Sequence, residues 1–172
     1  MTAMSSPTAA APTMDPRVQK RTLRLLSNGV YIITSRAGDQ LGTATVTWVS
    51  QASFKPPLLM AAIRPESSVF RCLSQSLAAN LHILGSQQCD IAQKFFAPTR
   101  PGPGVINGEP FLEGETPAPI LKNARAYLEC RVQQIIENGG DHKIVVMKVV
   151  NAACREPLEP LTIAQSPWEY GG

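Results

Sequence analysis

A group of hydroxyl and amide side chains gathers at the end of a predicted strand, where a chain of this size would normally pack its core. The members are Thr45, Thr47, Ser50, Gln51 and Ser53. The alternation of Thr with Val and Trp before them is typical of a half-buried strand. Side chains of this kind, together with free backbone N–H groups, can bind a polar ligand along the strand end.

A second polar group, in the sequence RPESS, could bind an anion. Ser67 and Ser68 stand at the predicted start of a helix, next to Arg64. The helix dipole and free N–H groups favour an anion there, and the hydroxyls and the guanidinium add donors. The alternative is that Ser67 only caps the helix. A polar strand end beside an anion pocket would suit a phosphorylated ring cofactor.

The two histidines have different settings. His142 follows two glycines and Asp141 at the base of a predicted hairpin, where its imidazole could reach a cleft or could belong to an exposed turn. His82 lies inside an apolar segment, which favours a hydrogen-bonded position in the core or an interface.

Other catalytic and metal-binding patterns are missing from the sequence. It contains no P-loop, no G-x-S-x-G, no H-E-x-x-H, and no G-x-G-x-x-G after a strand. Cys72, Cys89, Cys130 and Cys154 are far apart and none belongs to a C-x-x-C pair. We therefore expect no metal site, and cysteines that fill the core.

Composition narrows the functional class. The 172 residues are 44% hydrophobic and 17% charged with a net charge of +3, which is typical of one globular domain. The charge is too low to indicate nucleic-acid binding. Neither a secretory leader nor an apolar run of membrane length is present, so we expect a cytoplasmic protein that does not bind a membrane.

The predicted helices and strands follow from the periodicity of hydrophobic residues and from the Gly and Pro residues that separate the segments. Residues 1–14 are expected to be a disordered tail and residues 15–172 the domain, which begins with a helix capped by Asp15 and ended by a left-handed Gly29. Further helices are expected at 65–76 and 87–96, a long Pro/Gly loop at 97–119, and six strands at 30–36, 43–49, 56–63, 79–85, 126–140 and 142–154. Together they predict a mainly β protein with short helices, an antiparallel barrel whose long last hairpin packs on a partner subunit.

Four segments in this order resemble the flavin reductase-like family, whose fold is an FMN-binding split barrel. They are GTATVTWVSQASF, PPLLMAAIRPESS, NLHILGSQQCDIAQKFF and LECRV followed by GGDHKIVVMKVV. The stretch WVSQASFKPP is similar to the flavin reductase-like modules of flavodiiron proteins. The resemblance covers residues 15–161 and implies a homodimeric, six-stranded antiparallel Greek-key split β-barrel that holds FMN or FAD.

The resemblance also implies which residues contact the cofactor. The ring and ribityl chain would lie along Thr45, Val46, Thr47 and Trp48, and then Ser50, Gln51 and Ala52. The phosphate would lie at Arg64, Ser67 and Ser68, with Lys94 and Phe95 closing that side. His142 would be catalytic, near the nicotinamide. The chain departs from the family at His82, where Asn is common, and at Met147–Val149, where Gly-Glu-Val is common.

The implied activity is hydride transfer from NAD(P)H to FMN or FAD, with reduced flavin or electrons passing to a partner oxygenase or another acceptor. The flavin would supply the reactivity, which agrees with the missing catalytic patterns. Two alternatives remain open at this point. One is an FMN-binding electron-transfer protein without its own NAD(P)H activity, and the other is a split barrel that binds haem or another ligand.

Overall fold

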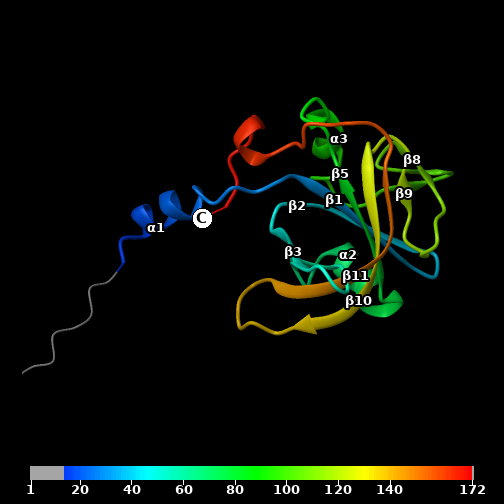
Figure 1. The fold of residues 1–172 in the computed structure, drawn as a ribbon, viewed down its shortest axis with the longest axis horizontal. Helices are drawn as coiled ribbons and strands as arrows, with labels where there is room; N and C mark the ends of the chain where they lie inside the picture. The colour runs from blue at the N-terminus through cyan, green and yellow to red at the C-terminus, as the bar shows by residue number, and fades with distance from the viewer. Residues whose placement is uncertain (1–13, 172) are drawn as a thin grey trace, which may run out of the picture.

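The computed structural model describes residues 14–171, so the predicted tail lies outside the described residues except for Met14. Seven strands form one antiparallel sheet in the order β2-β1-β5-β10-β11-β4-β3. The sheet curls on itself, as Figure 1 shows, and its two edge strands are consecutive in the sequence. The strands are β1 Tyr31–Ala37, β2 Gln40–Val46, β3 Val49–Ser53, β4 Leu58–Ile63, β5 Ala78–Ile83, β10 Ala126–Ile136 and β11 Lys143–Cys154.

The predicted mainly β split barrel is confirmed, with one strand more than expected. The additional strand is β3, because the chain turns after Val46 and residues 49–53 pair with β4 instead of prolonging β2. The long hairpin is confirmed as well. Its strands β10 and β11 have 11 and 12 residues, and Gly139 takes a left-handed φ of 77° in the turn between them.

Three short α-helices are present among the described residues: α1 Pro16–Leu23, α2 Ser68–Ser76 and α3 Cys89–Lys94. Asp15 caps α1 as predicted, since its carboxylate accepts from the backbone N–H of Arg17 at 2.8 Å. The predicted end of α1 is wrong. The helix stops at Leu23, and Gly29 forms a β-bridge with Thr162 instead of a left-handed cap. No described helix is long and apolar enough to cross a membrane.

The segment predicted as a long loop contains most of a second, four-stranded antiparallel sheet. Its strands are β6 Pro101–Gly102, β7 Val105–Ile106, β8 Glu109–Leu112 and β9 Ile120–Leu121. Asn107 and Gly108 join β7 to β8 with positive φ angles of 52° and 80°. An Asn-Gly pair with two positive φ values is the standard two-residue hairpin turn, so a sequence signal for this hairpin was present within the Pro/Gly-rich segment.

Two apolar cores lie on opposite faces of the main sheet. Because side chains alternate along a strand, Ile33 belongs to the core inside the curl and its neighbour Ile32 to the outer core. The inner core also receives Val69 and Leu73 from α2. The outer core includes residues of α3, the small sheet and the C-terminal segment, and it therefore fixes these parts against β1.

His82 occupies a hydrogen-bonded core position, as predicted. Its side chain is fully buried, and its Nε2 accepts from the backbone N–H of Leu121 at 2.9 Å. The proton must therefore be on Nδ1, which donates to the carbonyl of Ile32 at 3.0 Å. This neutral tautomer connects β5, β1 and β9. Burial is the main cause that lowers the pKa of His82 to about 4.

We predict that His82 makes the stability of the protein depend on pH. The unfolded chain takes up a proton at His82 below pH ~6.5, whereas the folded protein resists it until about pH 4. The free energy of unfolding should therefore fall as the pH drops through this window, by up to about 3 kcal/mol from this residue. Urea unfolding of wild type and His82→Gln at several pH values measures the effect. Parallel losses in the two proteins would contradict it.

Candidate functional site

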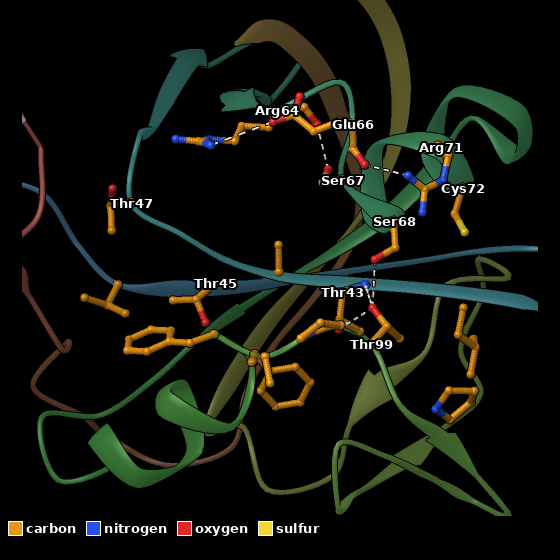
Figure 2. Close-up of a pocket in the computed structure, with 18 of the residues that line it drawn as sticks. Thr43, Thr45, Thr47, Arg64, Glu66, Ser67, Ser68, Arg71, Cys72 and Thr99 are labelled. Carbon is orange, nitrogen blue, oxygen red and sulfur yellow. Dashed lines mark hydrogen bonds and ion pairs between the residues drawn. The ribbon is translucent and has the colours of Figure 1, made fainter. Parts of the chain in front are cut away.

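A cavity of about 1530 Å³ lies along β2 (Figure 2). Its other walls come from the start of α2, the segment 95–99 after α3, and the C-terminal segment around residues 163–170. Thr43, Thr45 and Thr47 line the cavity, while Val46 between the last two packs in the inner core. The alternation noticed in the sequence thus divides this strand between a core and a binding surface.

Two of these threonines have contrasting hydrogen bonding. Thr45 donates to the carbonyl of Ala92 at 3.0 Å and so holds α3 beside the strand. Thr47 Oγ1 is, within residues 14–171, the one buried side-chain nitrogen or oxygen atom that has no hydrogen-bond partner. A buried hydroxyl without a partner costs free energy unless something bonds to it. The residue lies in the cavity wall, so rotation of its side chain toward the cavity would let a polar atom of a ligand complete the bonding.

The two serines of the RPESS segment differ in whether their hydroxyl groups are available to a ligand. Ser67 caps α2: its hydroxyl accepts from the N–H of Phe70 at 3.2 Å and donates to the carbonyl of Arg64 at 2.7 Å. The proton of Ser67 is therefore engaged, and the capping alternative describes its bonding. Ser68, by contrast, turns its hydroxyl to Thr99, with 2.8 Å between the oxygens.

Ser68, Thr99 and Thr43 form a hydroxyl cluster in the cavity wall. Thr99 Oγ1 lies 3.1 Å from Thr43 Oγ1 and accepts from the backbone N–H of Thr43 at 3.0 Å. The cluster has three hydroxyl protons but only two oxygen–oxygen contacts, so one proton is left over whichever way the rotors turn. An acceptor in the cavity, such as a phosphate oxygen, can take this proton in a hydrogen bond.

A glycine allows the hydroxyl cluster to form. A Cβ on Gly42 would stand 2.4 Å from the carbonyl oxygen of Ser68, which is closer than such atoms approach. The absence of a side chain at this position lets the first turn of α2 lie directly against β2. The helix start, with its unpaired N–H groups and positive dipole end, is thereby placed next to the leftover hydroxyl proton.

Charged side chains stand at the rim of the same end of the cavity. Arg64 and Glu66 are 3.8 Å apart and both well exposed, so this ion pair contributes little. Arg71 donates to the backbone carbonyl of Glu66 at 2.5 Å. The wall also contains Asp39, so two guanidinium and two carboxylate groups nearly balance, and positive charge for an anionic ligand comes from an individual guanidinium such as that of Arg64.

A smaller cavity of about 180 Å³ adjoins the large one and contains the predicted catalytic histidine. His142 is buried, its ring centre lies 4.7 Å from that of Trp48, and its Nδ1 is 2.8 Å from an oxygen of Asp141. The hydrogen bond with His142 lowers the pKa of the Asp141 carboxyl. Tyr170 lines both cavities, as do Thr45 and Thr47, so a ligand in one lies beside a ligand in the other.

The structure gathers most of the predicted site residues. Those that line one or both cavities are Thr45, Val46, Thr47, Trp48, Arg64, Ser67, Ser68, Phe95 and His142. Ser50, Gln51 and Ala52 lie on the exposed strand β3 and line neither cavity.

Lys94 is also directed elsewhere. Its ammonium forms an ion pair of 2.6 Å with the nearly buried carboxylate of Glu109, and this hydrogen bond raises the pKa of Lys94. The side chain therefore stabilises the small sheet against α3 and is not part of either cavity wall.

The sequence reasoning missed several residues of the cavity walls, among them Thr43, Thr99, Trp168 and Tyr170. Thr43 continues the alternation of Thr45 and Thr47, so a signal for it existed. Thr99 lies in the Pro/Gly-rich segment, and Trp168 and Tyr170 lie near the chain end. Nothing in the sequence around these three residues indicates that they line the cavity.

Comparison with known proteins gives one consistent result. A model of the flavin reductase like domain matches residues 23–169. Diflavin flavoprotein A 1 of a Synechocystis species is 34% identical over 140 residues, which is 81% of this chain and 24% of that protein. A probable flavin reductase of Rhizobium meliloti is 26% identical over 141 residues, 81% of this chain and 44% of that protein.

Solved structures share the fold. The NADH:FAD oxidoreductase SgcE6 of Streptomyces globisporus superimposes with a TM-score of 0.73 at 24% identity, over 89% of this chain and 92% of that one. The chain spans about a quarter of the length of the diflavin relatives and less than half of the Rhizobium protein. It thus corresponds to one module of those proteins.

Proposed function

Because this chain belongs to the flavin reductase-like family, we propose that it binds FMN or FAD and transfers hydride to it from NAD(P)H. Reduced flavin, or its electrons, then passes to a partner oxygenase or another acceptor. When bound, the flavin would accept the hydride and a proton from water while NAD(P)H becomes NAD(P)⁺. The protein's own contribution is to bind, orient and shield.

The observation that carries the proposal is the unpartnered hydroxyl of Thr47 in the wall of the large cavity. A flavin ring carries several polar atoms on its edge, and one of them would supply the missing hydrogen bond once the Thr47 side chain turns toward the cavity. Thr47 is only 6% exposed, so bulk water offers little compensation for an unbonded group. The position of this hydroxyl next to the aromatic small cavity suits the ring end of the cofactor.

The phosphate end would lie at the hydroxyl cluster. Ser68, Thr99 and Thr43 offer one free proton, the start of α2 offers backbone N–H groups, and Arg64 offers a nearby positive charge. The cavity is large enough for FMN and for FAD. This assignment differs from the sequence-based one, since Thr43 and Thr99 take the place of Ser67 and Lys94.

His142 would orient the hydride donor. The residue sits in the small cavity beside Trp48, next to the wall that both cavities share. A group that fixes the relative position of donor and acceptor acts through geometry, where small displacements change rates strongly. No strong acid or base is required for this role.

We also propose a homodimer. Helix α1 buries none of its residues and extends away from the sheet in Figure 1. The residues that follow it include Leu25 and Leu26, which are 80% and 64% exposed. A second copy of the chain would cover this apolar surface.

The dimer is tested by light scattering at micromolar concentration. We expect twice the 18.6 kDa mass of the chain. Leu26→Asp should shift the protein toward the monomer, because it places a charge in the proposed interface. A monomeric mass for the wild type with flavin bound would reject the arrangement.

The activity is tested by adding NADH or NADPH to the flavin-loaded protein without oxygen and following the loss of flavin absorbance. We expect the wild type to bleach without a partner protein. His142→Ala should bleach at least about tenfold more slowly, with flavin affinity almost unchanged, because it removes orientation and not binding. Stopped-flow spectroscopy measures the rates.

Other results of this experiment would identify other functions. Bound flavin that NAD(P)H does not bleach would identify an electron-transfer protein. A Soret band without flavin absorbance would identify a haem-binding split barrel. A wild-type bleaching rate in His142→Ala would remove this histidine from the site.

The phosphate assignment is tested with the double variant Ser68→Ala/Thr99→Val. Loss of the hydroxyl cluster removes hydrogen bonds to a charged group that contribute about 1.5–3 kcal/mol each, so flavin should bind at least about tenfold more weakly. Ser67→Ala should instead lower stability by about 1 kcal/mol through loss of the helix cap. Ser74→Ala, on the exposed side of α2, is the matched control. A flavin dissociation constant unchanged in the double variant would locate the phosphate elsewhere.

A further inference from the structure

The C-terminal segment returns to the start of β1 and is fixed there by backbone bonds. Val30 donates to Leu161 at 2.9 Å, Leu161 to Leu84 at 2.9 Å, and Ile163 to Asn28 at 2.9 Å. A short 3₁₀ helix, η1 Ile163–Gln165, follows. The chain then continues along the large cavity, where Trp168, Glu169 and Tyr170 form part of the wall.

Aromatic contacts hold this wall to the rest of the site. Trp168 meets Phe96 edge to face, with ring centres 4.8 Å apart. Tyr170 lies 6.1 Å from Trp48, and Trp48 lies 4.7 Å from His142. Pairs at these separations attract each other through their ring quadrupoles. Three rings therefore surround the small cavity. They are Trp48 after β2, His142 in the turn of the β10–β11 hairpin, and Tyr170 near the chain end.

Arg24 fixes the residues on either side of Tyr170. Its Nη1 pairs with a carboxylate oxygen of Glu169 at 2.9 Å, and its Nε donates to the carbonyl of Gly171 at 2.9 Å. Glu169 is largely exposed, so this ion pair contributes little to global stability. Its two bonds to flanking residues instead restrict where the Tyr170 ring can lie.

The size of the small cavity indicates what it can hold. At about 180 Å³ it is slightly larger than the engineered apolar cavity of about 150 Å³ that binds benzene. One six-membered ring fits, whereas a three-ring flavin requires the large cavity. Since Thr45, Thr47 and Tyr170 line both cavities, a ring in the small one lies next to a flavin in the large one.

We infer that Tyr170 is a positioning residue for the nicotinamide ring of the hydride donor, which it holds in the small cavity together with Trp48 and His142. This inference rests on the proposed function for the presence of a nicotinamide substrate. Arg24 and Glu169 act through Tyr170 by fixing the backbone around it. The specificity of the site for a flat ring thus depends on a segment more than 100 residues away from β2.

Titration of the flavin-loaded protein with NAD⁺ and NADP⁺ tests the inference, because binding of the oxidised nucleotides requires no turnover. Tyr170→Ala should weaken binding of the nucleotide that the wild type prefers by about tenfold or more, since a ring contact and its buried area are lost. Flavin affinity should fall by a clearly smaller factor, because Tyr170 also lines the large cavity, and the melting temperature should stay the same. Tyr170→Phe should restore binding because the ring is retained, and Glu169→Gln should weaken it by a smaller factor.

Tyr127→Ala is the matched control, because this tyrosine lies on β10 against Arg155 and lines neither cavity. Equal nucleotide binding by Tyr170→Ala and wild type would overturn the inference, and so would a loss of flavin affinity as large as the loss of nucleotide affinity. A wild type that binds flavin but neither nucleotide would also overturn it. Nucleotide binding without bleaching by NADH or NADPH would reject the proposed activity while leaving the role of Tyr170 supported.

Discussion

The position of β2 at the edge of the curled sheet is the constraint on which the site depends. Among the described strands it pairs only with β1, so its other side is free for contacts with helices and loops. Thr45 bonds to α3, Thr43 bonds to the segment after α3, and Gly42 admits the first turn of α2. A strand of seven residues thereby locates three walls of one cavity. A partner strand at this edge would leave no room for them.

The chemistry that this arrangement favours is recognition and orientation. Hydroxyl groups and aromatic rings line the two cavities, while the nearly buried carboxylate of Glu109 is used in packing, bonded to Lys94 and Asn123. A site of this type binds a cofactor that brings its own reactivity, and it controls which molecules reach that cofactor. The small aromatic cavity then determines which molecule can lie beside the cofactor.

The sequence predicted the parts of the fold that have a local cause. Asp15 caps its helix, the glycine turn closes the long hairpin, His82 is in the core, and Thr45 and Thr47 leave the core. Part of what it missed had a local signal, as the Asn107-Gly108 turn did, and the rest depends on tertiary contacts. Thr99 meets Thr43 across 56 positions, and Arg24 meets Glu169 across 145. No periodicity or spacing encodes such pairs. Lys94 was assigned to the cofactor by position, whereas its nearest acceptor comes from a small sheet that had been predicted as a loop.

The hydroxyl cluster of Thr43, Ser68 and Thr99 has a consequence for ligand exchange. If the anion were bound by several groups of like charge instead, these groups would repel one another whenever the anion left. That repulsion would destabilise the folded protein. Three neutral hydroxyls do not repel one another in this way, because each can turn between donor and acceptor while the two oxygen–oxygen contacts stay in place. The proton left over then changes its partner when a ligand binds or leaves. Anion binding by such a hydroxyl cluster is readily reversible. It also does not change with pH over the range where hydroxyl groups do not ionise.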